Sequence, residues 1–157
     1  PARGLVALFR TVPDLVWALI FVIAVGLGPF AGTLALAVDT AGFCGRFFAE
    51  AMEDVDRGPA DSLRAQGVRR LDTIFCATIP GALPAFVTTS LFALEKSTRS
   101  SVVLGLVGAG GIGLELKVAM DLFDYQRAAT IILMIFVLVV MVEQAGALVR
   151  ARIIKDS

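Results

Sequence analysis

Residues 61–67 read Asp-Ser-Leu-Arg-Ala-Gln-Gly, and after nine further residues positions 77–80 read Ala-Thr-Ile-Pro. This polar segment, with its glycine and its proline, separates two long apolar parts of the chain. An anchor that only holds a protein in a membrane has no need for such a structured, charged insert. The pattern predicts two short helices at the membrane surface against which another protein docks. An ordinary interhelical loop is the alternative that the residues alone leave open.

The composition is that of an integral membrane protein. Hydrophobic residues make up 57% of the chain and the mean hydropathy is +0.84, against about 45–50% apolar residues in soluble domains. Fourteen basic and fourteen acidic residues cancel, so no global field favours nucleic acid as a partner. Histidine is absent, and Cys44 and Cys76 lack the spacing of a metal or redox motif. We therefore expect an all-α integral membrane protein with no cofactor or metal of its own.

Four segments are apolar over lengths that suit membrane spans, each of which needs about 20 residues. Together they are expected to form a single transmembrane domain, residues 1–157, in the lipid bilayer. The expected spans are residues 5–25, 30–52, 83–106 and 125–149, joined by a cytoplasmic loop at 57–82 and an outer glycine-rich loop at 105–123.

Basic residues near membrane spans concentrate on the cytoplasmic side. Only Lys117 and Arg127 fall on one side of the expected spans, while nine basic residues fall on the other. This asymmetry predicts that the insert and both chain ends are cytoplasmic. The nine residues are Arg3, Arg10, Arg57, Arg64, Arg69, Arg70, Arg150, Arg152 and Lys155.

The insert carries its own helix signals. Pro59 suits a first helical turn, and Asp61 lies near the positive end of that helix. Gly67 suits the position just beyond a helix end, where glycine adopts a left-handed backbone without strain. A second short helix is expected over residues 71–77, stopped before Pro80. The corner between the two helices would present Leu63, Gln66 and Val68.

The insert resembles the signature loop of bacterial ABC importer permeases, whose pattern is Glu-Ala-Ala, three residues, Gly, nine residues, then Ile-x-Leu-Pro. The spacing of Gly67 and Pro80 agrees with that pattern, whereas the acidic triplet at 61–63 is degenerate. In that family the loop is a coupling helix that enters a groove on separate ATP-binding subunits, which hold ATP and Mg. The resemblance therefore implies that this corner, with Asp61, Leu63, Gln66, Gly67 and Val68, contacts an ATPase.

Further segments at 16–22, 25–32, 103–113 and 123–126 resemble phosphonate-type permeases. The resemblance implies a type I ABC importer permease of the bacterial inner membrane that carries phosphonate or a related phosphorus oxyanion. It also implies an extracytoplasmic substrate-binding protein, a second permease copy and further helices before Pro1. Asp39 departs from the family, where histidine is expected.

Charged residues within the third expected span need a cavity or a partner, because a charge there costs about 2.5–3.5 kcal/mol on insertion scales. Glu95 and Arg99 are four residues apart and can pair on one helix face. Alternatively, Lys96 and Arg99 offer positive potential to a passing anion, with hydroxyl donors such as Ser100 and Thr89. Weak contacts would suit such a pathway, because a tight clamp would trap the anion.

Residues 108–113 read Gly-Ala-Gly-Gly-Ile-Gly, which fits the dinucleotide-binding fingerprint G-x-G-x-x-G. That motif requires a preceding strand and a βαβ unit, for which this chain has no room. The glycines are expected instead to make tight turns on the outer face or to line a cavity.

The favoured function is a permease subunit that couples ATPase motion to alternating access and carries out no chemistry itself. The alternative is a stand-alone channel or secondary transporter for small anions, with Asp39, Glu95 and Arg99 as a relay. A membrane-embedded enzyme is the weakest reading, because positioned titratable groups for acid–base catalysis are lacking.

Overall fold

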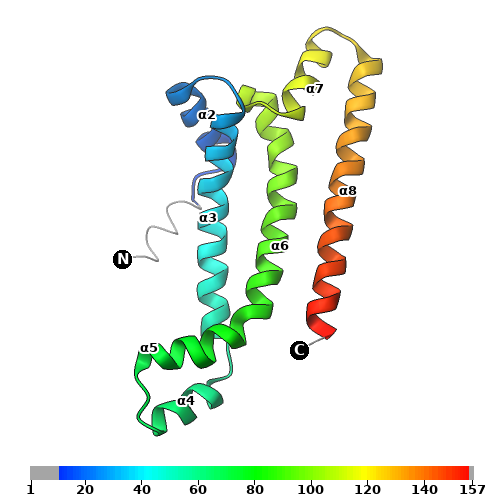
Figure 1. The fold of residues 1–157 in the computed structure, drawn as a ribbon. Helices are drawn as coiled ribbons and strands as arrows, with labels where there is room; N and C mark the ends of the chain where they lie inside the picture. Colours follow the sequence, from blue (N-terminus) through cyan, green and yellow to red (C-terminus); the bar gives the residue numbers. More distant parts are fainter. Residues whose placement is uncertain (1–10, 156–157) are drawn as a thin grey trace.

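A computed structural model describes residues 11–155, which form an elongated helical bundle with a bent hairpin at one end (Figure 1). Two long helices, α3 and α6, run side by side, and α8 packs along the other side of α6. In chain order the elements are α2 Asp14–Val25, α3 Pro29–Glu53, α4 Arg57–Ala65, α5 Arg70–Thr73, the π-helix η1 Ile74–Thr78, α6 Ile79–Leu104, the π-helix η2 Gly105–Ala109, α7 Ile112–Asp121 and α8 Tyr125–Lys155.

Small residues let the helices approach closely. Ala31, Ala35, Asp39 and Gly42 are buried on α3, and their spacing of three or four residues places them on one face. Small-residue faces are typical of helix packing in membranes, where apolar side chains are equally well solvated by lipid. The large apolar side chains of α8 are instead exposed, as expected for a lipid-facing surface; they include Leu133, Met134, Phe136 and Met141.

Two helical segments, Arg70–Ala109 and Tyr125–Arg152, are long and apolar enough to cross a membrane. Helix α3 has 25 residues, but Asp39, Arg46 and Glu50 lower its apolar character, and α2 is an apolar helix of 12 residues. Four helices thus stand where spans were expected, and the number that cross the bilayer stays a prediction. Residues 5–10 of the first expected span lie outside the described residues.

Pro80 does not end the second helix of the insert, contrary to expectation. The helix continues from α5 through η1 into α6, with Pro80 in the first turn of α6 and Pro84 inside it. A π-helical turn widens the backbone, and a proline lacks the N–H that a regular turn would require. The chain therefore bends here without breaking, and the bend turns the insert away from the bundle axis (Figure 1).

The expected outer loop at 105–123 is largely helical, because η2 and the ten-residue α7 occupy it. Its glycines serve close packing: a Cβ on Gly113 would lie 2.1 Å from the carbonyl oxygen of Val102, and one on Gly105 would lie 2.6 Å from the Cα of Gly113. Gly108 and Gly110 adopt positive φ angles of 91° and 80°. Among residues 11–155 the segment follows a helix, so the dinucleotide interpretation has no structural support.

Candidate functional site: a protruding hairpin and an intramembrane polar cluster

Helix α4 is held at both ends by local hydrogen bonds. The Asp56 carboxylate accepts a bond of 3.1 Å from the backbone N–H of Gly58 at its start. At its end, the N–H of Gly67 donates to the Arg64 carbonyl at 2.9 Å and that of Val68 donates to the Leu63 carbonyl at 3.2 Å. These two bonds form a Schellman motif. Gly67 has a φ of 80° there, so the predicted left-handed position is confirmed.

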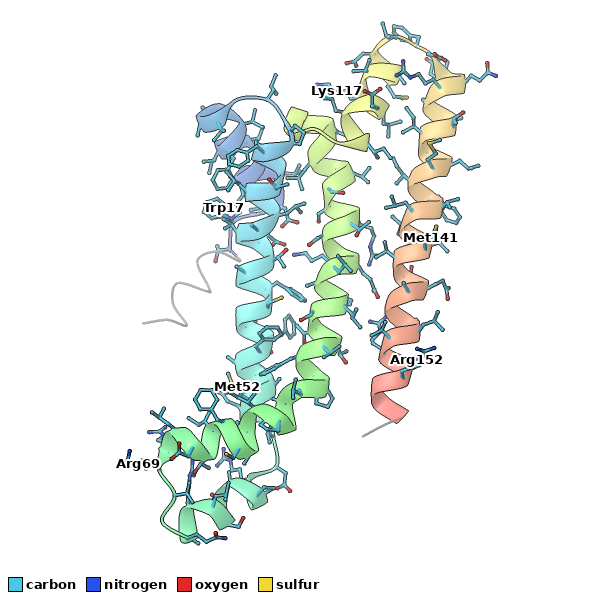
Figure 2. All side chains as sticks on the ribbon, viewed as in Figure 1. Trp17, Met52, Arg69, Lys117, Met141 and Arg152 are labelled. Carbon is cyan, nitrogen blue, oxygen red and sulfur yellow. The ribbon has the colours of Figure 1, made fainter. Side chains whose placement is uncertain are left out.

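The hairpin formed by α4 and α5 projects from the bundle as its own unit (Figure 1). Arg69 lies at its tip, and Lys117 lies at the opposite pole of the molecule (Figure 2). Of the predicted docking residues, Asp61, Gln66 and Gly67 are exposed, and Leu63 and Val68 are partly exposed. Local backbone hydrogen bonds thus define the conformation of a small corner that projects from the bundle.

Polar side chains between α3 and α6 form a cluster within the bundle. The Lys96 ammonium lies 2.6 Å from the Asp39 carboxylate and 5.3 Å from the centre of the Phe43 ring. In the next positions along the two helices, the hydroxyls of Thr40 and Ser97 form a hydrogen bond of 3.0 Å. Because Asp39 neutralises it, Lys96 does not offer a free positive charge to an anion.

The predicted pairing of Glu95 with Arg99 is wrong. Glu95 is 8% exposed and pairs instead with Arg150 of α8 at 2.9 Å. Gly146 makes room for this carboxylate, since a Cβ on it would lie 2.4 Å from Glu95 Oε1. Burial explains why Glu95 pairs with Arg150 and not with Arg99. Glu95 is buried and faces α8, where Arg150 can reach it, whereas Arg99 is exposed.

Arg99 makes no hydrogen bond or ion pair with any described side chain. It lines a cleft of about 390 Å³ between the start of α2 and the end of α6. Ser100 lines the same cleft and donates a hydrogen bond of 3.0 Å to the Asp14 carboxylate. Thr89, the fourth predicted pathway residue, lies on the part of α6 nearer the hairpin and does not line the cleft. The residues that line it are Pro13, Asp14, Leu15, Arg99, Ser100, Val103 and Leu104.

Sequence reasoning missed the roles of Asp14, Gly146 and Arg150. The sequence carries no pattern that marks Asp14, and Arg150 stands among the basic residues expected on the cytoplasmic side. A search for opposite charges on different expected spans would have included the Glu95–Arg150 pair. No local pattern marks Gly146, because its importance depends on a side chain 51 positions away in the chain.

The fold is that of an ABC importer permease. The inward-facing MetNI methionine ABC transporter superposes with a TM-score of 0.78 at 22% identity, over 96% of this chain and 73% of the solved chain. An amino acid ABC transporter superposes with a TM-score of 0.79 at 17% identity, over 95% of this chain and 73% of that chain. The chain belongs to the family of binding-protein-dependent transport system inner membrane components, which matches residues 1–155.

Curated relatives share more of the sequence. HtxE of Stutzerimonas stutzeri, provisionally named a phosphite transport system permease protein, is 44% identical over 98% of this chain and 59% of its own length. The phosphate-import permease protein PhnE of Mycolicibacterium smegmatis is 39% identical over 98% of this chain and 29% of its own length. The phosphite transport system permease protein PtxC of Stutzerimonas stutzeri is 40% identical over 95% of this chain and 54% of its own length. The chain therefore spans between 29% and 59% of the length of these relatives.

Proposed function

We propose that this chain is the permease core of an ATP-driven importer for phosphonate, phosphite or a related phosphorus oxyanion. The observation that carries the proposal is the hairpin of α4 and α5, because it projects the family's signature loop beyond the bundle. Phosphorus oxyanions are proposed as the cargo because the named relatives belong to phosphite and phosphate transport systems.

In this proposal the α4 corner transmits movement from the ATPase. Asp61, Gln66 and Gly67 are exposed for contact, and the two Schellman bonds hold the corner rigid. A rigid corner passes on displacement, whereas a flexible loop would absorb it. The segment formed by α5, η1 and α6 is helical from Arg70 to Leu104, so a movement at the hairpin reaches α6 directly.

Arg99 is the pathway residue that the charge distribution favours. Lys96 and Arg150 each have a carboxylate partner, at 2.6 Å and 2.9 Å. The same two pairs occupy Asp39 and Glu95, which weakens the alternative of a carboxylate relay in a stand-alone transporter. Ser100 lies beside Arg99 but donates its one hydroxyl proton to Asp14, and Thr89 would contact the anion only nearer the hairpin.

The remaining parts of the assembly are proposed from the family. Two permease copies would enclose the central pathway, with ATP-binding subunits on the hairpin side and a substrate-binding protein at the α7 side. ATP and Mg would be bound by the ATPase, and both chain ends would lie in the cytoplasm of a bacterial cell.

The test is uptake of radiolabelled phosphite, methylphosphonate and phosphate by cells that carry the complete transport system. The proposal predicts accumulation of at least one of these anions that stops when the P-loop lysine of the ATPase is substituted. A matched strain lacking only this permease should show the same loss. Uptake that persists without the functional ATPase would establish the stand-alone transporter instead.

A further inference from the structure

The turn between α7 and α8 exposes an apolar tip at the end of the molecule opposite the hairpin (Figure 1). The tip consists of Leu122, Phe123 and Tyr125, whose exposed fractions lie between 64% and 74%. The rings of Phe123 and Tyr125 meet edge to face, with their centres 6.4 Å apart. Large apolar side chains that gather on a surface in this way mark a contact with a partner or a membrane.

Phe123 occupies a backbone position that normally selects glycine. Its φ is 56°, the one positive φ of a non-glycine residue among residues 11–155. The N–H of Phe123 donates to the Met120 carbonyl at 3.1 Å, and that of Asp124 donates to the Ala119 carbonyl at 2.9 Å. These two bonds form a Schellman motif, in which glycine is the usual residue at this position. Phenylalanine is strained there, and its exposed ring gains little packing within the chain in return, which indicates that the ring contacts something outside it.

Tyr125 continues the lipid-facing surface of α8. The exposed side chains of Ile132 and Phe136 follow it by two and three helical turns, so all three lie on one face of the helix. At the helical rise per residue, Tyr125 lies about 17 Å from the middle of the apolar run at 131–142, which is about 2 Å beyond the edge of a hydrocarbon core of about 30 Å. This is the depth of the lipid headgroups, where tyrosine is enriched.

Charged side chains near the apolar tip limit how deeply it can enter the membrane. Asp121 and Asp124 lie beside it in the sequence, and Arg127 of α8 pairs with Glu115 of α7 at 2.7 Å. Such groups are costly in the hydrocarbon core, so the headgroup layer is the depth that suits both the charges and the apolar side chains. Docking of a water-soluble protein would not explain why the tip continues the lipid-facing side of α8.

We infer that Leu122, Phe123 and Tyr125 anchor the turn between α7 and α8 in the headgroup layer of the leaflet opposite the hairpin, with the phospholipid surface as their partner. The anchor fixes the depth of this end of α8 in the bilayer. The inference requires that α8 crosses the membrane, and it does not depend on which anion is transported.

The test measures the depth of a single tryptophan at the apolar tip. Phe123→Trp is made in the full-length protein with every other tryptophan, Trp17 included, replaced by phenylalanine. The protein is held in nanodiscs of phosphatidylcholine that is brominated either close to the headgroup or close to the end of the acyl chains. Quenching by the shallow bromines should be severalfold stronger than by the deep ones. Phe136→Trp, in the middle of α8, should show the reverse order, and Gln66→Trp, at the hairpin corner, should be quenched only by iodide in the water.

A second variant separates an anchor from a purely structural turn. In a Tyr125→Trp background, Phe123→Gly relieves the backbone strain, so it should not lower the melting temperature in detergent, yet it should reduce quenching by the shallow bromines severalfold. Tyr125→Trp also reports on the apolar tip if Phe123→Trp does not fold. Quenching at the tip by iodide alone would overturn the inference, because the tip would then lie in water. Protection from both quenchers would also overturn it, in favour of a surface covered by a protein, and unchanged quenching in Phe123→Gly would contradict the anchoring role of Phe123.

Discussion

The Glu95–Arg150 pair should hold α6 against α8, and its removal one charge at a time measures that role. The Glu95 side chain is 9% exposed and the Arg150 side chain 26% exposed, at an N–O distance of 2.9 Å. Breaking a fully buried ion pair from one side costs about 3–5 kcal/mol, because the remaining charge stays buried. The exposed quarter of Arg150 lowers the expected loss for Glu95→Gln to about 2–3 kcal/mol.

The assay is SDS-induced unfolding of the purified full-length protein, followed by loss of helical circular dichroism. Arg150→Met should also destabilise, since it leaves the Glu95 carboxylate uncompensated. The double variant should be more stable than the sum of the single losses predicts. Arg152→Gln, an exposed arginine one half-turn further along α8, is the matched control and should unfold like the wild type. Additive losses in the double variant, or an unaffected Glu95→Gln, would refute the argument that this pair joins the helices.

Three further predictions concern the hairpin, the polar cluster and the outer helix packing. Gly67→Ala should cost about 1–2 kcal/mol at the turn, because its φ of 80° is strained for a residue with a Cβ; ATP-dependent uptake should fall, while Gly58→Ala, within α4, should leave uptake unchanged. Lys96→Gln should lower the yield of folded protein by leaving Asp39 unpaired in the bundle, and adding Asp39→Asn should restore that yield in size-exclusion chromatography. Gly113→Ala should lower the thermal stability, because its Cβ would meet the Val102 carbonyl at 2.1 Å and only a backbone shift can relieve that contact; an unchanged melting temperature would contradict the close packing.

Local chemistry explains why the hairpin could be predicted from the sequence. The start near Pro59 and the glycine at 67 both depend on rules that act over three or four residues. The end of the second helix could not be predicted in the same way. Pro80 normally stops a helix, but the π-helical turn before it and the continuing apolar run of α6 let the helix pass through.

Charge pairing was predicted less well, because it depends on which faces of distant helices meet. Glu95 and Arg99 satisfy the spacing rule for an intrahelical pair, yet the packing of α6 against α8 gives Glu95 a partner 55 positions away. Lys96 likewise pairs with Asp39, 57 positions away. The sequence indicated that charges within the bundle need partners, but only the helix packing determines which charged side chains pair with each other.

The most direct test of the coupling account is site-specific photo-crosslinking in native membranes. A photoreactive residue replaces Gln66 at the hairpin corner in one sample and Met141 in the exposed middle of α8 in another, both in the full-length protein. The account predicts a covalent adduct with a P-loop ATPase from position 66 and none from position 141. Absence of the ATPase adduct at position 66, or an equal adduct at position 141, would contradict the claim that this corner is the ATPase-docking site.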